Sequence, residues 1–129
     1  MLTLSFEKGA SMALQDYLNE QCDSLGLKWL TVIGIDGLTL CSSGIDEQFE
    51  LAALLPDWMD TSHNLAKAAH LENGMGLICL VPKSGGYLLL MKDFEVRGER
   101  MFILLATPKI PAKAVRVVKE ICSHVASAL

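Results

Sequence analysis

The sequence predicts a single α/β domain of the α+β type, built on one five-stranded, mostly antiparallel sheet flanked by helices. Three segments carry apolar residues at helical spacing, and five short segments rich in strand-forming residues lie between them, in the order α-β-β-α-β-β-β-α. The links between consecutive strands are short, which implies antiparallel pairing, and the helices must then cover the sheet. A chain of 129 residues is the size of one ordinary domain, so we expect residues 1–129 to form one unit.

The first helix and the first two strands are predicted from periodicity and turn residues. Apolar residues recur three and four apart over residues 7–25, which places them on one helical face, and Gly26 would end the helix. Residues 27–35 and 38–41 are two strand-like runs on either side of Asp36-Gly37. Asp-Gly suits a tight turn with positive φ, so we expect a hairpin.

A long second helix is predicted over residues 47–71, with Asp46 as its N-cap. Pro56 removes one backbone hydrogen bond, so we expect a kink or a restart near Leu55. The apolar residues fill two neighbouring stripes, with Leu51, Leu55, Trp58, Ser62, Leu65 and Ala69 in one and Ala52, Met59 and Ala66 in the other. A helix that is apolar on two sides is buried on two sides. One side can cover the domain's own sheet, and a second copy of the chain is the simplest cover for the other.

The remaining elements follow from turns and prolines. After Asn73-Gly74, we expect strands over residues 75–81, 87–91 and 100–107, separated by turns at residues 82–86 and 94–99. Pro108 and Pro111 end the last strand, and Pro111 suits the first turn of a final helix. The apolar face of that helix is expected to contain Ala114, Val118, Ile121, Cys122, Val125 and Leu129.

Composition and charge exclude several classes of function. Hydrophobic residues make up 51% of the chain and charged residues 20%, so a domain this small is expected to hide surface against a partner. The net charge of −4 and the lack of a basic run argue against nucleic acid binding. No apolar stretch reaches the ~18–20 residues that cross a bilayer, so we expect no membrane insertion. The N-terminus does not resemble a signal peptide, so we expect a cytoplasmic protein.

The residues that usually carry chemistry are scattered. The four cysteines, Cys22, Cys41, Cys79 and Cys122, form no C-x-x-C pair and are expected to be reduced and buried. His63 and His70 are two helical turns apart, too far to share a metal, and His124 points away from Cys122. No P-loop motif is present. We therefore predict no enzyme activity, no cofactor, no metal and no catalytic residue.

Three features together resemble the Roadblock (dynein light chain) family, in its bacterial MglB-like branch. The first is the strand–Asp-Gly–strand opening over residues 32–40. The second is Glu50-Leu51-Ala52-Ala53 at the start of a long helix that ends at Asn73-Gly74. The third is a set of three strands with Ser84-Gly85-Gly86 in its first turn, followed by a last amphipathic helix. The resemblance spans the chain from Leu14 to the end.

The resemblance implies a Roadblock/profilin-like fold and a homodimer in which the long helix and the third strand pair across a two-fold axis. It further implies that the dimer docks onto a small Ras-like GTPase and regulates its nucleotide cycle, or scaffolds other complexes, without donating a catalytic side chain. The residues that we assign to the dimer interface are Leu51, Leu55, Trp58, Met59, Ser62, Leu65, Met75, Leu77 and Cys79.

The long helix also offers two candidates for partner docking, Asp57 and Asp60, which lie just after Pro56. Carboxylates in this position are stabilised by the helix dipole, and they could equally meet a basic patch on a partner. Pro56 would bend the surface assigned to pairing.

Two other functions remain open at this point. A small-molecule sensor of the PAS or profilin type would bind its ligand between sheet and helix, although few polar residues are expected in the core to orient one. A pure scaffold would dock onto its partner without any effect on GTP hydrolysis, and the sequence does not separate this from a regulator.

Overall fold

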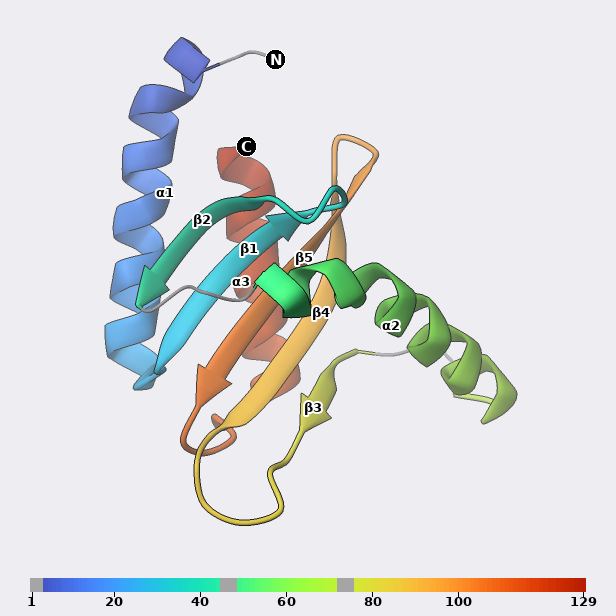
Figure 1. The fold of residues 1–129 in the computed structure, drawn as a ribbon. Helices are drawn as coiled ribbons and strands as arrows, with labels where there is room; N and C mark the ends of the chain where they lie inside the picture. The colour runs from blue at the N-terminus through green and yellow to red at the C-terminus, as the bar shows by residue number, and fades with distance from the viewer. Residues whose placement is uncertain (1–3, 45–48, 72–75) are drawn as a thin grey trace.

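The computed structural model describes residues 4–44, 49–71 and 76–129, with side chains from residue 12 in the first segment and from residue 51 in the second (Figure 1). The predicted order of elements is confirmed. It comprises α1 (Leu4–Leu25), β1 (Trp29–Gly34), β2 (Thr39–Gly44), α2 (Phe49–Ala68), β3 (Ile78–Leu80), β4 (Leu88–Val96), β5 (Glu99–Thr107) and α3 (Ala114–Ala128).

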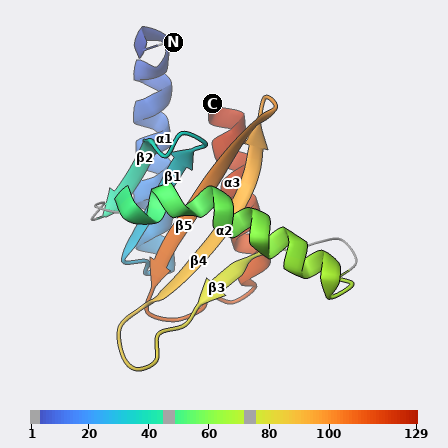
Figure 2. The same cartoon turned by 45° about the vertical axis from the view of Figure 1, so that its right-hand side comes forward.

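The five strands form one sheet in the order β2-β1-β5-β4-β3, and every neighbouring pair is antiparallel. Helices α1 and α3 lie on one face of this sheet, and α2 crosses the other face (Figure 2). The sheet is therefore buried on both sides, which explains why β1 is buried at all six of its positions.

Two apolar cores lie on the two faces of the sheet. The larger joins α1 and α3 to strand residues such as Leu30, Val32 and Leu105. The smaller lies beneath α2, where Leu55 and Met59 pack against residues that alternate with the first set along the same strands. The smaller core consists of Trp29, Ile33, Ala52, Leu55, Met59, Met91, Phe102, Leu104 and Ala106. The alternation follows from the two-residue period of a strand.

Several strand and helix boundaries differ from the predictions: α1 begins earlier, β2 extends to Gly44, and α2 ends earlier, at Ala68. Strand β3 has three residues, and Met75, which we placed in it, lies outside the described residues, as do Asp46, Asn73 and Gly74. Strand β4 continues to Val96, so the predicted turn at 94–99 shrinks to Arg97 and Gly98. Helix α2 runs through Pro56, and the predicted restart near Leu55 is absent. Burial of its apolar stripe outweighs the one backbone hydrogen bond that proline removes.

Two glycines fix the first hairpin and the end of β2. Gly37 has φ +84°, and the neighbouring Leu38 N–H donates to Asp36 Oδ1 at 3.1 Å, which forms the predicted Asp-Gly turn. Gly44 has φ +85° and lies against the start of β1, where a Cβ atom would come within 2.6 Å of the Lys28 carbonyl oxygen. Glycine is therefore the residue that this close approach of the end of β2 to the start of β1 accepts.

The two edges of the sheet differ. At the β2 edge, the Gln15 side chain of α1 donates from Nε2 to the Ser42 carbonyl oxygen, and its Oε1 lies 3.4 Å from Cys41 Sγ. At the other edge, β3 pairs with β4 on one side, and no described strand pairs with its second side. One backbone carbonyl of the β2 edge is thus bonded by a side chain of α1, whereas no side-chain hydrogen bond to the β3 edge is found among the described residues.

Candidate interaction surface

Helix α2 has two flanks beside the stripe that faces the sheet. The first, which we call the apolar flank, consists of Leu51, Leu54, Trp58 and Leu65. Leu51 is half-buried, whereas Leu54, Trp58 and Leu65 are 56%, 44% and 69% exposed. Their spacing of three, four and seven residues places them along one line on the helix. An isolated exposed leucine is ordinary, but a line of four large apolar residues on one helix is typical of an interaction surface.

Strand β3 extends this apolar surface. Ile78 and Leu80 pack against the core beneath α2, and both remain half-buried. Leu77 and Cys79 pack against the opposite core, beneath α3. Because the second side of β3 has no described strand partner, its backbone N–H and C=O groups can pair with an added strand.

The second flank of α2 is polar and contacts the sheet through charges. Asp93 on β4 receives hydrogen bonds on Oδ2 from Arg100 Nε and Nη2 at 3.1 and 3.0 Å, and His63 Nε2 lies 2.9 Å from the same oxygen. Arg100 also donates from Nη1 to Asp60 Oδ1 at 2.7 Å. The four residues link α2, β4 and β5, and Arg100 lies over the ring of Phe102 at 5.1 Å. This arrangement anchors α2 on its polar flank, while Leu54, Trp58 and Leu65 of the apolar flank stay exposed.

The charges in this cluster shift the pKa of two of its members. Burial alone raises the pKa of the Asp93 carboxyl, but the hydrogen bonds and charges of His63 and Arg100 outweigh it and hold that pKa below its ordinary value. Burial lowers the pKa of the Arg100 guanidinium, and the hydrogen bonds and charges of Asp60 and Asp93 reverse this and raise it. Asp93 and Arg100 are therefore both charged at neutral pH, as expected of an anchoring contact.

The predicted interface residues divide into three groups. Trp58 and Leu65 are exposed, and Leu51, Ser62, Leu77 and Cys79 are half-buried, so all six are within reach of a partner. Leu55 and Met59 are buried in the core beneath α2, and we correct their assignment, because the side of the helix that bears them faces the sheet. Met75 lies outside the described residues. Leu54, Ile78 and Leu80 were missed, although the four-residue spacing from Leu54 to Trp58 could have identified the first.

The two carboxylates predicted to dock a partner have different surroundings. Asp57 is exposed. Asp60 is exposed too, but it forms the ion pair with Arg100 described above, so part of its charge is already neutralised within the chain. Of the two, Asp57 is the better placed to meet a basic partner.

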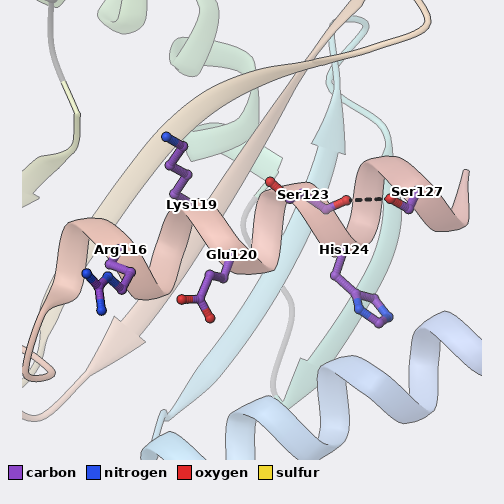
Figure 3. Close-up of a pocket in the computed structure, with 6 residues that line it drawn as sticks. All are labelled: Arg116, Lys119, Glu120, Ser123, His124 and Ser127. Atoms are coloured by element: carbon purple, nitrogen blue, oxygen red, sulfur yellow. Dashed lines mark hydrogen bonds between the residues drawn. The ribbon is translucent and has the colours of Figure 1, made fainter.

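A shallow groove of about 390 Å³ runs along the outer side of α3 and is lined by Arg116, Lys119, Glu120, Ser123, His124 and Ser127 (Figure 3). Arg116 and Lys119 point away from each other, and Glu120 and His124 turn toward α1, where the His124 ring stacks on Tyr17 at 3.6 Å between centroids. Burial, reinforced by Glu120 and Glu20, raises the pKa of the Tyr17 hydroxyl. These side chains diverge, so they do not form a site for a small ligand.

Two of the buried thiols have raised pKa values, and the described part of the chain holds no cluster of metal-binding side chains. Burial raises the pKa of the Cys122 thiol to about 12 and also raises that of Cys41. Among the described residues, no group of three His, Cys, Asp or Glu side chains could hold a metal ion. No helix in the described ranges is both long and apolar enough to cross a membrane.

Comparison with known proteins identifies the fold. No protein-family model matches the chain, and no curated protein matches it in sequence. Among solved structures, MglB of Myxococcus xanthus superimposes with a TM-score of 0.67 at 16% identity, over 90% of this chain and 86% of that one. A structure described as MglB with tetrameric arrangement gives 0.71 at 16% identity, over 92% and 89% of the two chains. A Roadblock/LC7 domain from Streptomyces avermitilis gives 0.54 at 15% identity, over 88% and 95%. The chain therefore has the Roadblock/LC7 fold, in the form seen in MglB.

Proposed function

We propose that this chain is a cytoplasmic, homodimeric interaction module that docks onto a small Ras-like GTPase and regulates it. The observation that carries this proposal is the apolar flank of α2 beside the open edge of β3. The fold shared with MglB supports it, because the sequence resemblance to the MglB-like branch implies the same role. In this proposal the module contributes binding surface and no catalytic side chain.

The dimer would form by a two-fold arrangement in which α2 and β3 meet their own copies. Pairing of β3 with its copy would satisfy the open backbone groups and join two sheets, while Trp58 and Leu65 would pack between the two α2 helices. Trp is a residue type that often dominates interface energies. A stable interface buries about 800 Å² on each partner, so the helix and the strand would both have to contribute.

Light scattering tests the dimer with a matched pair of substitutions. Leu65→Glu places a charge on the apolar flank, and Leu38→Glu places the same charge in the β1–β2 turn, where the native leucine is equally exposed at 65% against 69%. We expect the wild type and Leu38→Glu to be dimers and Leu65→Glu to be a monomer, because burying an unpaired carboxylate is costly. If the Leu65→Glu variant is still a dimer, the proposal that α2 lies in the dimer interface is wrong.

GTP hydrolysis by the cognate Ras-like GTPase tests the partner. We expect the hydrolysis rate to change when the module is added, and the change to be lost with Asp57→Lys. Asp16→Lys, which alters an exposed aspartate on α1, serves as the control and should behave like the wild type. Binding without any change in hydrolysis would identify a pure scaffold instead.

A further inference from the structure

We propose that one end of the sheet docks onto an anionic lipid surface. This basic end is formed by residues 26–28, 81–87 and 108–113, and its exposed side chains are Lys28, Lys83, Lys109 and Lys113 together with Val81, Tyr87 and Ile110. The inference does not depend on the proposed dimer or on the GTPase.

Three segments that are distant in the sequence meet at this end. The Lys28 N–H donates to the Ala106 carbonyl oxygen at 2.7 Å, which joins the start of β1 to the end of β5. Thr107 Oγ1 donates to the Lys109 carbonyl oxygen at 2.7 Å and holds the link to α3. Lys28 Nζ lies 5.3 Å from the centre of the Tyr87 ring, which ties the β3–β4 loop to the same place. The segments lie together at the lower end of the molecule in Figure 1.

The charge of this end is opposite to that of the rest of the chain. Its three segments contain four lysines and no Asp or Glu, whereas the remainder holds seven basic and fifteen acidic residues, a net charge of −8. All four lysines are exposed, and none forms an ion pair with another residue that the structure describes. The nearest acidic residue along the chain is Asp23, in the last turn of α1. A positive field thus projects from one end of an acidic protein.

Lys113 adds an argument from helix electrostatics. It immediately precedes α3, in a left-handed conformation with φ +54°, and the first turn of α3 contains no acidic residue. The N-terminus of a helix carries a partial positive charge, so a lysine there does not stabilise the helix. The position of this charge is explained by an anionic partner rather than by the stability of the fold.

Exposed apolar side chains lie among the lysines. Val81 and Tyr87, at the two ends of the β3–β4 loop, are 69% and 37% exposed, and Ile110, between β5 and α3, is 53% exposed. Tyr87 also lines a shallow hollow of about 450 Å³, together with Gly26, Leu27, Lys28, Gly86 and Pro108. Tyrosine is favoured at the boundary between lipid headgroups and acyl chains, and lysine stems can reach headgroup phosphates while their methylenes stay in apolar surroundings.

The choice of lysine favours a lipid surface over a protein partner. Protein interfaces are depleted in lysine and enriched in arginine, whose planar group makes fixed paired hydrogen bonds. Lysine is a flexible point charge, which suits mobile headgroups that present no fixed geometry. This end has four lysines and no arginine. No part of the chain needs to cross the bilayer for such docking.

Co-sedimentation of the full chain with vesicles tests the proposal. One set of vesicles contains phosphatidylcholine alone, and the other contains phosphatidylcholine with one third phosphatidylglycerol. We expect the wild type to sediment with the anionic vesicles at low salt, to stay in solution with the neutral ones, and to be released by 0.5 M salt, because salt screens the attraction. A wild type that stays in solution with anionic vesicles at low salt overturns the proposal.

Two matched double variants assign the effect to the basic end. Each lysine near an anionic leaflet typically raises partitioning about fivefold, so Lys109→Glu with Lys113→Glu should lower it by about 25-fold or more. Lys67→Glu with Lys119→Glu changes the net charge equally on other exposed surfaces and should lower it less than threefold. Equal losses in both variants overturn the proposal.

Two further measurements test the role of the exposed apolar residues and the possibility that the partner is an acidic protein. Tyr87→Ala with Ile110→Ala should weaken vesicle binding without changing its salt dependence, and circular dichroism must show that every variant is folded. Binding of the wild type to soluble polyglutamate, with no binding to anionic vesicles, would assign the basic end to an acidic protein and overturn the lipid proposal.

Discussion

His63 Nε2 lies 2.9 Å from Asp93 Oδ2, across the gap between α2 and the sheet. The two residues are thirty positions apart, and Arg100 joins them by donating to the same carboxylate oxygen. The contact fixes the polar flank of α2 over the β4–β5 hairpin. It therefore helps to determine which side of the helix stays exposed.

Removing the charge of Asp93 should destabilise the protein. Asp93→Asn keeps the shape but loses the ionic hydrogen bonds from Arg100 and His63, which we expect to cost about 1–3 kcal/mol in free energy of unfolding. Asp57→Asn, on the exposed side of α2, should change the free energy of unfolding by less than about 0.5 kcal/mol. Urea denaturation at pH 7 measures both. Equal stability of the two variants would mean that the cluster does not anchor α2.

The same carboxylate should make stability depend on pH. The pKa of Asp93 in the folded chain lies below its ordinary value of 3.8, so the unfolded chain binds the proton more readily. The contribution of Asp93 is therefore present above pH 3.8 and is lost as the pH falls through the lower, folded-state pKa. Denaturation of the wild type and of Asp93→Asn between pH 2.5 and pH 7 should show the two curves converging at the acid end. Curves that stay parallel would contradict this.

Two adjacent leucines on α2 should respond differently to truncation. Leu55 is 1% exposed and Leu54 is 56% exposed. Leu55→Ala should lower the free energy of unfolding by about 2–5 kcal/mol, because it leaves a cavity beneath the helix. Leu54→Ala should change it by less than about 0.5 kcal/mol when measured on the monomeric Leu65→Glu background. A reversed order would mean that α2 is rotated about its axis relative to the sheet.

Gly44 should tolerate no side chain. Its φ of +85° is strained for other residues, and a Cβ atom would come within 2.9 Å of Trp29 Cα as well as closer still to the Lys28 carbonyl oxygen. Gly44→Ala should therefore lower the melting temperature by several degrees, consistent with a cost of about 1–3 kcal/mol. Gly85→Ala is the control, since that glycine also has a positive φ of +60°, but a Cβ atom added there would meet no other atom within 4 Å. If both variants lose melting temperature equally, the loss in Gly44→Ala comes from the positive φ alone and the close contact with β1 contributes nothing.

The four thiols should differ in reactivity. The Cys122 pKa of about 12 leaves about one thiolate in ten thousand at pH 8, and the thiol is buried beneath α3. Cys79, half-buried on β3, is the most accessible of the four. Iodoacetamide labelling followed by mass spectrometry should modify Cys79 first and Cys122 only after denaturation, with Cys79→Ser as the control for assignment. Early labelling of Cys122 would show that α3 opens readily.

The sequence was sufficient to predict the elements, because each has its own periodicity or turn signal. The two-sided apolar character of α2 was also visible in it. The assignment of Leu55 and Met59 to the interface is wrong, because both are buried against the sheet. The rotation of a helix about its axis is set by the sheet beneath it and by contacts such as that of His63 with Asp93. The sequence predicted a β4 strand that is too short, because Lys92, Asp93 and Glu95 are charged residues of the kind found in turns. In the structure all three are paired with β5, and Lys92 lies on the opposite face of the sheet from Asp93 and Glu95.

The hydrogen bond from Gln15 to Ser42 has a consequence for the size of any assembly. A sheet can grow into a filament only if both of its outer strands accept neighbours, and a strand that pairs with β2 at Ser42 would first have to displace Gln15. Pairing through β3 breaks no side-chain hydrogen bond that the structure describes at that edge. We therefore expect strand pairing to favour two copies joined through β3 over growth into fibres.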